Sequence, residues 1–358
     1  MTCLRNVFLV ALLCFARTVF AADAGCVPTD LFRFVCGPTN AEDLVRVPDT
    51  KWIIASSFVA GNGLYLIDSR DDTWSVLPIQ AQHDATFKDC PTAPTLAELV
   101  THGLNLRAGA HGHSRLYVVG HGGREAIEVF DVDASDKRPI VTWKGCVPLP
   151  GGLAANSVAS FADGSLVATV PLMPGKSFAD SFAGTTTGTV VRWSPGSSGF
   201  EIVKGTELAY NNGIEVSADG REIFVASSGS RTVVAYSNTN PAKQLRVTRT
   251  LPFVPDNVHM GSDGRLLTAG MKLDEAACGG AQGTQDFEKL RSCPRGTFAT
   301  AIDGATMKDT VLIEAPANSA FSNATMVLTI GDQFWLGTFS GDRVAYGTLR
   351  SLANSSTN

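Results

Sequence analysis

One pattern recurs six times along the sequence and restricts the fold more than any other feature. Each copy begins with a polar residue, continues into an alternating apolar strand, turns, and returns as a second strand. The clearest copy, with its turn at Asp219-Gly220, is YNNGIEVSADGREIFVASSGSRTVVAYS, residues 210–237. Short runs with period-two alternation, separated by Gly-containing turns, are typical of β-strands joined in hairpins.

The opening residues of the copies are spaced by roughly 45–65 residues. They are Glu42, His102, Asn156, Asn212, Asn257 and Asn323. Six copies of three or four strands predict an all-β chain folded as a six-bladed β-propeller. A β-sandwich would explain the strands but not the sixfold recurrence. The last copy has only three clear strands, so we expect a strand within residues 31–37 to complete it and close the ring.

Segments with helical character are few, and the main candidates are residues 94–100 and 284–292. The N-terminus has a basic residue, an apolar run and small residues near Ala21, which predicts a signal peptide over residues 1–24, cleaved after Ala21 or Ala24. Residues 25–358 are expected to form one propeller domain. Lipidation of Cys26 is an alternative, but Asp23 stands where such signals carry an apolar residue.

Six cysteines follow the predicted signal peptide, and an even number in an exported chain indicates disulfides. Proximity in sequence favours Cys26–Cys36 and Cys278–Cys293, which leaves Cys90–Cys146 among 15 possible connectivities. The formal net charge of -5 and the absence of a long basic tract argue against nucleic acid as a partner. No later stretch reaches the length of a transmembrane helix.

The first strand of each propeller blade lines the central channel, so the opening residues are expected to converge at one mouth of that channel. Side chains near these openings are rich in oxygen: Glu42 with Asp43, Asn156, Asn212, and Asp256 with Asn257. Buried amides and carboxylates are costly unless something binds them. Carboxylate and amide oxygens are the ligands that calcium prefers. The alternative for each residue taken singly is a cap on a strand turn.

Four of the six histidines lie between residues 99 and 123. A hairpin that turns at His111-Gly112 would place His102 opposite His121 at its open end. His111 and His113 would then lie in the exposed turn, and we assign neither a role. His259, within a strand, is likewise assigned no role.

Several stretches, in order along the chain and one per blade, resemble the paraoxonase/arylesterase family of gluconolactonase-like, calcium-dependent six-bladed propellers. They are AEDLVRVPD, THGLNL with LYVVGHGG, AANSVASF, NNGIEVSADGREIFVA and PDNVHM, within residues 38–348. The resemblance implies hydrolysis of lactones and aryl esters. It also implies a catalytic calcium site at Glu42, Asn156, Asn212, Asp256 and Asn257, and a histidine dyad at His102 and His121.

The sequence departs from the family pattern in three places. A second, structural calcium is implied by Asp43 and the Leu104 backbone, but Ser157 stands where the family has an acidic residue. Met271 stands where the family has a histidine. No cysteine follows Cys293, so strand pairing or another bridge must close the ring instead of the family's disulfide between the chain ends.

The expected mechanism combines a metal and a base. Calcium would polarise the substrate carbonyl, and neutral His102 would take a proton from the attacking water while His121 orients it or relays the proton. Asp256 acting as base or nucleophile is the alternative. Two other functions stay open: a gluconolactonase-like enzyme acting on a polar sugar lactone, and a non-catalytic propeller that binds a ligand.

Overall fold

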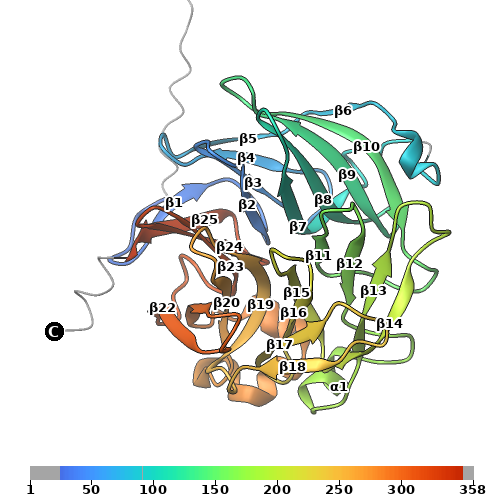
Figure 1. Cartoon of the computed structure of the whole chain (residues 1–358). Helices are drawn as coiled ribbons and strands as arrows, with labels where there is room; N and C mark the ends of the chain where they lie inside the picture. The colour runs from blue at the N-terminus through green and yellow to red at the C-terminus, as the bar shows by residue number, and fades with distance from the viewer. Residues whose placement is uncertain (1–24, 91, 350–358) are drawn as a thin grey trace, which may run out of the picture.

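Six β-sheets are arranged as blades around a central channel (Figure 1). The computed structural model describes residues 25–90 and 92–349. The predicted signal peptide over residues 1–24 lies outside the described residues. The innermost strand of each sheet contacts the innermost strands of the two neighbouring sheets, so these six strands form a closed ring. The prediction of an all-β, six-bladed propeller is confirmed.

The first three blades follow one another in chain order. The first contains β2 (Leu44–Arg46), β3 (Trp52–Ala55), β4 (Tyr65–Asp68) and β5 (Thr73–Val76). The second contains β6 (Ile79–Ala81), β7 (Val100–Ala108), β8 (His113–His121), β9 (Ala126–Asp133) and β10 (Ile140–Pro148). The third contains β11 (Val158–Ser160), β12 (Leu166–Val170), β13 (Gly188–Trp193) and β14 (Glu201–Leu208).

The remaining blades complete the circle. The fourth contains β15 (Asn211–Val216), β16 (Glu222–Ser227), β17 (Thr232–Ser237) and β18 (Gln244–Val247). The fifth contains β19 (Phe253–Met260), β20 (Leu266–Lys272), β21 (Thr297–Ile302) and β22 (Asp309–Ala315). The sixth contains β23 (Ala324–Ile330), β24 (Gln333–Thr338), β25 (Arg343–Thr348) and β1 (Arg33–Cys36).

Strand pairing between the two ends of the described chain closes the ring. β1 runs antiparallel to β25, with Arg33 opposite Tyr346 and Cys36 opposite Arg343. The expected strand within residues 31–37 is therefore present, in the sixth blade. All three favoured disulfides are also present: Cys26–Cys36 beside this strand, Cys90–Cys146 in the second blade, and Cys278–Cys293.

Apolar side chains are buried between neighbouring blades. One cluster joins the third and fourth blades through Val190 and Val203 on one side and Ile214, Ile223 and Val225 on the other. A single sheet of four strands has two apolar faces and cannot cover both, so each blade needs its neighbours. Burial of this kind therefore holds the channel-lining strands at fixed positions.

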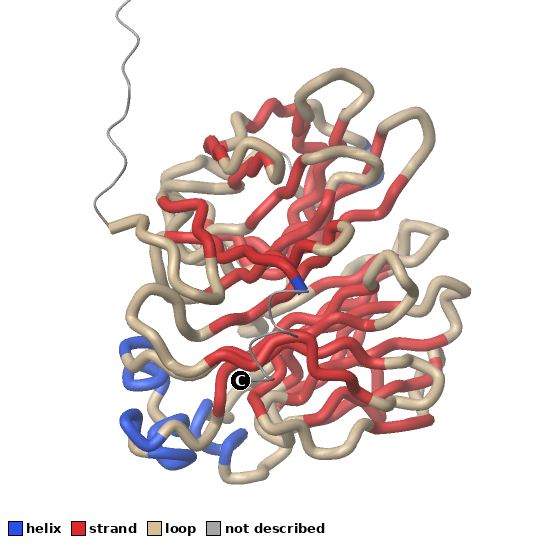
Figure 2. Tube along the Cα trace, turned by 90° about the vertical axis from the view of Figure 1, so that its left-hand side faces the viewer, coloured by secondary structure: helices blue, strands red, loops and turns tan. Residues whose placement is uncertain are grey.

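Helical segments lie mainly on one side of the ring (Figure 2). The expected helix within residues 284–292 is α2 (Phe287–Ser292). The helix expected over residues 94–100 is wrong, because only a turn forms at residues 96–98 and Val100 already pairs in β7. The sequence did not indicate β6, α1 (Phe178–Phe182), or the 3₁₀ turns η1 (Ala85–Phe87), η2 (Ala276–Cys278) and η3 (Gly280–Gln285). The helices in the described ranges are too short or too polar to cross a lipid bilayer.

Candidate metal centre and histidine pair

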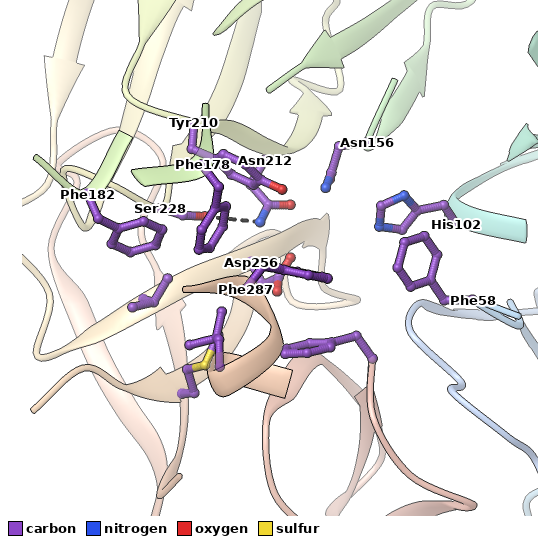
Figure 3. Close-up of a pocket in the computed structure, with 14 residues that line it drawn as sticks. Phe58, His102, Asn156, Phe178, Phe182, Tyr210, Asn212, Ser228, Asp256 and Phe287 are labelled. Carbon is purple, nitrogen blue, oxygen red and sulfur yellow. Dashed lines mark hydrogen bonds between the residues drawn. The ribbon is translucent and has the colours of Figure 1, made fainter. Parts of the chain in front are cut away.

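The opening residues of the first five blades meet at one mouth of the channel. Asn257 Nδ2 donates a hydrogen bond to Glu42 Oε1 at 2.6 Å, although 215 residues separate them. Figure 3 shows Asn156, Asn212, Asp256 and His102 arranged around one space. The sixth opening residue, Asn323, instead donates to the backbone carbonyls of Leu290 and Arg291, near the end of α2.

Irregularities in the innermost strands turn these side chains into the channel. The pairing registers shift between Thr101 and Leu104, between Asn211 and Ile214, and between Pro255 and Val258. The residues skipped by these shifts include His102, Asn212, Asp256 and Asn257. A β-bulge redirects the side chains of its extra residues, so these four side chains can point into the channel.

A glycine beside two of these residues lets adjacent blades approach closely. A Cβ at Gly103 would lie 2.6 Å from the carbonyl oxygen of Asn156, and one at Gly213 would lie 2.4 Å from the backbone nitrogen of Val258. No real side chain tolerates such distances. The sequences His102-Gly103 and Asn212-Gly213 thus bring the oxygens of neighbouring blades together.

Four oxygens of the predicted calcium set are buried and have no hydrogen-bond partner among the described residues. They are Glu42 Oε2, Asn156 Oδ1, Asn212 Oδ1 and Asn257 Oδ1. Buried polar atoms in native proteins nearly always have a partner, so each exception requires an explanation. A shared ligand that accepts oxygen donors would explain four exceptions that face one channel from four blades.

The two carboxylates of the set are held in an environment that disfavours their negative charge. Burial, followed by the charges of Asp256 and Asp43, raises the pKa of Glu42 well above its ordinary value. Burial also raises the pKa of Asp256 to about 8, where a hydrogen bond from Asn212 opposes the rise and the charge of Asp43 adds to it. A bound cation would reverse both effects.

These donors fit calcium. Two carboxylates and three amides supply only oxygen, in the number that calcium uses together with water or substrate. No group of three or more His, Cys, Asp and Glu side chains is arranged to hold a metal in residues 25–90 and 92–349. The candidate set does not depend on such a group, because three of its five members are asparagines.

The surroundings of Asp43 do not fit a second calcium. Its Oδ1 accepts from Leu44 N at 2.8 Å and its Oδ2 from Leu104 N at 2.7 Å. His259 Nε2 lies 2.8 and 3.0 Å from the same two oxygens. Burial alone would lower the pKa of His259, but Asp43 and Glu215 raise it to about 10. The His259 imidazolium therefore neutralises the Asp43 carboxylate. The Leu104 backbone contributes an N–H hydrogen-bond donor at this position.

His102 and His121 are in contact, with His102 Nδ1 3.1 Å from His121 Nε2. The expected register, with His102 opposite His121, is wrong: Val100 pairs with His121, and the bulge at residues 102–103 separates this pair from Leu104 opposite Val118. The bulge nevertheless lets the side chain of His102 reach His121. The turn falls at His111-Gly112 as expected, where both residues have positive φ.

His102 faces the candidate metal set. Its Nε2 is 3.8 Å from Glu42 Oε1, and its ring packs against Phe58. Burial, with a smaller contribution from His121, lowers the pKa of His102 well below its ordinary value. A neutral imidazole in this position has a lone pair available for a proton. His111 and His113 are exposed at the far end of the hairpin, as expected.

Aromatic side chains form the outer wall of the pocket beside the candidate metal set. α1 contributes Phe178 and Phe182, and α2 contributes Phe287 and Leu290. Phe178 contacts Phe287 edge to face, so the two helices meet across the pocket (Figure 3). Other lining residues are Phe58, Tyr210, Ser228, Val254, Met271 and Phe339.

Two residues at the site were not found from the sequence. His259 lies two positions after Asn257 in β19, and a strand histidine gives no sign of its partners. Glu125 follows His121 by four residues in the turn HGGRE, and its Oε2 lies 2.6 Å from His121 Nδ1. The short spacing of a carboxylate and a histidine across a Gly-Gly turn could have indicated this second contact.

Comparison with known proteins supports the fold. No family model matches the sequence, and no curated protein matches it. Among solved structures, a luciferin-regenerating enzyme is similar with a TM-score of 0.54 and 12% identity, covering 87% of this chain and 92% of that one.

Two further solved structures are similar over comparable lengths. A putative gluconolactonase matches with a TM-score of 0.50 and 17% identity, over 89% of this chain and 94% of that one. A calcium-binding protein, regucalcin from Agrobacterium tumefaciens, matches with a TM-score of 0.50 and 10% identity, over 88% and 92%. At these identities the likeness shows the fold alone: this chain is folded like these solved structures.

Proposed function

We propose that this protein is an exported, calcium-dependent hydrolase of lactones or aryl esters with apolar substituents. The observation that carries the proposal is a set of four buried oxygens that have no hydrogen-bond partner among the described residues, beside an aromatic pocket and a histidine whose pKa is lowered. The names of two similar structures, a putative gluconolactonase and a calcium-binding regucalcin, agree with it. Three disulfides agree with export, since such bonds persist in oxidising compartments.

The calcium ligands would be Glu42, Asn156, Asn212, Asp256 and Asn257. Calcium held there would act as a Lewis acid that polarises a carbonyl oxygen. His102 Nε2 accepts a proton from the water that attacks the carbonyl carbon, and His121 holds the ring of His102 through the contact at Nδ1. Asp256 is the alternative base, but with its pKa raised to about 8 the carboxyl already carries a proton at neutral pH, and it can act as a base only after a cation has displaced that proton.

The pocket wall favours an apolar substrate over a sugar lactone. Away from the candidate ligands and His102, most of the lining side chains are aromatic or aliphatic. The hydroxyl groups of a sugar lactone would lose their hydrogen bonds to water against phenylalanine rings, which costs free energy for each unpaired group. An aliphatic acyl chain or a phenyl leaving group would bury apolar surface there instead.

The test is a substrate panel with metal analysis of the same samples. Aliphatic lactones, sugar lactones and phenyl esters are assayed with the wild type, Asn212→Ala, His102→Gln and a control, His113→Gln, at the exposed start of β8. We expect hydrolysis of the apolar members, a large loss in the first two variants, and no change in the control. Preference for sugar lactones would shift the substrate class to the gluconolactonase type. Activity on no member would favour a ligand-binding propeller.

A further inference from the structure

We propose that Glu125 is a positioning residue at the far end of a three-membered proton relay, Glu125–His121–His102. This inference rests on the proposed hydrolase function and adds to it a residue outside the metal set and the histidine pair. Two contacts define the relay: Glu125 Oε2 to His121 Nδ1 at 2.6 Å, and His121 Nε2 to His102 Nδ1 at 3.1 Å. At the end of the relay, His102 Nε2 lies 3.8 Å from Glu42 Oε1.

The order of donors and acceptors fixes where each proton lies. A carboxylate only accepts hydrogen bonds, so His121 Nδ1 must carry a proton. Neutral His121 then has a lone pair at Nε2 and accepts from His102, whose Nδ1 must carry the second proton. The only ring nitrogen of the pair left without a proton is therefore His102 Nε2, the nitrogen nearest Glu42. The His102 ring lines the pocket (Figure 3). Glu125 thus selects the tautomer that a general base needs.

The relay also gives the proton a balanced path. As the water oxygen bonds to the carbonyl carbon, its proton moves to His102 Nε2, and the Nδ1 proton of His102 moves to His121 Nε2. His121 is then an imidazolium beside the Glu125 carboxylate, which stabilises its charge. When the carbon–oxygen bond of the lactone breaks, the same protons move back and the leaving oxygen receives one. The net reaction adds water and consumes no other reactant.

Local backbone geometry places Glu125 beside His121. Gly122 and Gly123, between β8 and β9, both have positive φ, and a Cβ at Gly122 would lie 2.1 Å from Glu98 O. The backbone carbonyl of Glu125 accepts from Leu149 N at 2.9 Å. This turn reverses the chain within four residues, so the carboxylate reaches back to the histidine. The side chain of His121 is 17% exposed and that of Glu125 40%, so an ordinary surface ion pair is the competing explanation.

The experiment reads the tautomer of His121 directly, by 15N NMR of histidine-labelled full-length protein without substrate. The variants are Glu125→Ala, Glu125→Asp, and the control Glu98→Gln, a nearby carboxylate that bonds Thr95 instead. We expect the Nδ1–H tautomer of His121 in the wild type and the control. We expect a mixture in Glu125→Ala and recovery of the Nδ1–H form in Glu125→Asp.

Kinetics on the best substrate of the panel provide the second readout. We expect kcat of Glu125→Ala to fall about tenfold to a hundredfold at unchanged KM, which does not exceed the lower end of the roughly 100- to 10,000-fold that general-base catalysis supplies. A wild-type tautomer in Glu125→Ala, or a kcat equal to that of Glu98→Gln, would overturn the positioning role. Because the NMR readout needs no substrate, it decides the role of Glu125 even if no member of the panel is hydrolysed. Absence of hydrolysis would overturn the proposed hydrolase function, independently of the NMR result.

Discussion

Glu42 and Asp43 are consecutive acidic residues, both buried, and their carboxylates have opposite surroundings. Glu42 Oε2 has no hydrogen-bond partner in the described part of the chain, while Glu42 Oε1 accepts a hydrogen bond from Asn257 Nδ2. Asp43 accepts two backbone N–H groups and contacts the His259 ring. The Glu42 carboxylate, on what we call the open side, is thus available to a cation. The Asp43 carboxylate, on the balanced side, is neutralised by the cationic side chain of His259. The partners of a buried carboxylate, more than its presence, distinguish a metal site from an ion pair.

The largest expected effect is loss of activity when Glu42, on the open side, is replaced. Glu42→Gln should reduce kcat/KM for the preferred lactone by about 1,000-fold, because metal assistance is worth several kcal/mol and about 1.4 kcal/mol is tenfold. Glu215→Gln, on the balanced side, should leave kcat within about threefold. Steady-state kinetics at saturating calcium compare the two. Equal losses in both variants would remove the distinction between the two sides.

Substitutions on the balanced side, at the Asp43–His259 ion pair, should instead lower the free energy of unfolding. His259→Leu leaves the buried Asp43 carboxylate without its cationic partner and should lower the free energy of unfolding by about 3–5 kcal/mol. His113→Leu removes a histidine that is 57% exposed and faces an exposed carboxylate, and should change it by less than about 0.5 kcal/mol. Urea denaturation measures both variants. A stable His259→Leu protein would contradict the ion-pair assignment.

Calcium affinity should fall as the pH is lowered. Without metal, the pKa of Asp256 is raised to about 8, so below that pH calcium must displace a proton. The apparent dissociation constant should therefore rise by roughly tenfold for each pH unit below 8 for that one proton. Titration calorimetry at pH 6 and 8, in buffers of different ionisation enthalpy, measures the affinity and the proton release. Affinity independent of pH would mean that Asp256 is not a ligand.

The same raised pKa makes the stability of the metal-free protein change with pH in the direction opposite to calcium affinity: stability falls as the pH rises. Relative to the ordinary value of 3.8, the folded protein binds the Asp256 proton more tightly, so this contribution to stability is present at low pH and is lost as the pH rises towards 8. Saturating calcium should remove that loss. Melting temperatures with calcium and with chelator, at pH 5 and pH 8, check this: the stabilisation by calcium should be larger at pH 8.

The smallest effect is expected at the pocket wall. Phe178→Ala removes a ring that packs against Phe182, Tyr210 and Phe287. KM for a long-chain lactone or a phenyl ester should rise about tenfold, since a buried aromatic side chain contributes roughly 1.5–3 kcal/mol and part of the wall remains. Calcium affinity should not change. An unchanged KM would place the apolar part of the substrate elsewhere.

The blade organisation could be predicted from the sequence because strand alternation and turn residues are local signals. The opening residues followed from the same recurrence. Two disulfides followed from short separations along the chain, and Cys90–Cys146 was the pair that remained. The site depends on finer geometry. The bulge at His102-Gly103 coincides with close packing of Gly103 against the backbone of Asn156 in the next blade, and a hairpin register alone does not predict such a contact.

Long-range partners explain the other differences. His259 meets Asp43 across 216 residues, so its role depends on closure of the ring. The segment 94–100 has helical composition, but Val100 pairs with His121 as the first residue of β7. A helix of two turns is only marginally stable by itself, so strand pairing is favoured over it. In contrast, α2 starts from Asp286, whose side chain accepts from the backbone nitrogens of Glu288 and Lys289, a local signal that the sequence carries.

Calcium stoichiometry tests the central claim most directly. Chelator-treated protein is titrated with calcium by calorimetry, and the loaded protein is assayed by elemental analysis, for the wild type and Asn212→Ala. The open set at Glu42 and the ion pair at Asp43 together predict one calcium per wild-type chain and markedly weaker binding in the variant. No bound calcium would contradict the open site, and two per chain would contradict the assignment of His259 as the cation beside Asp43.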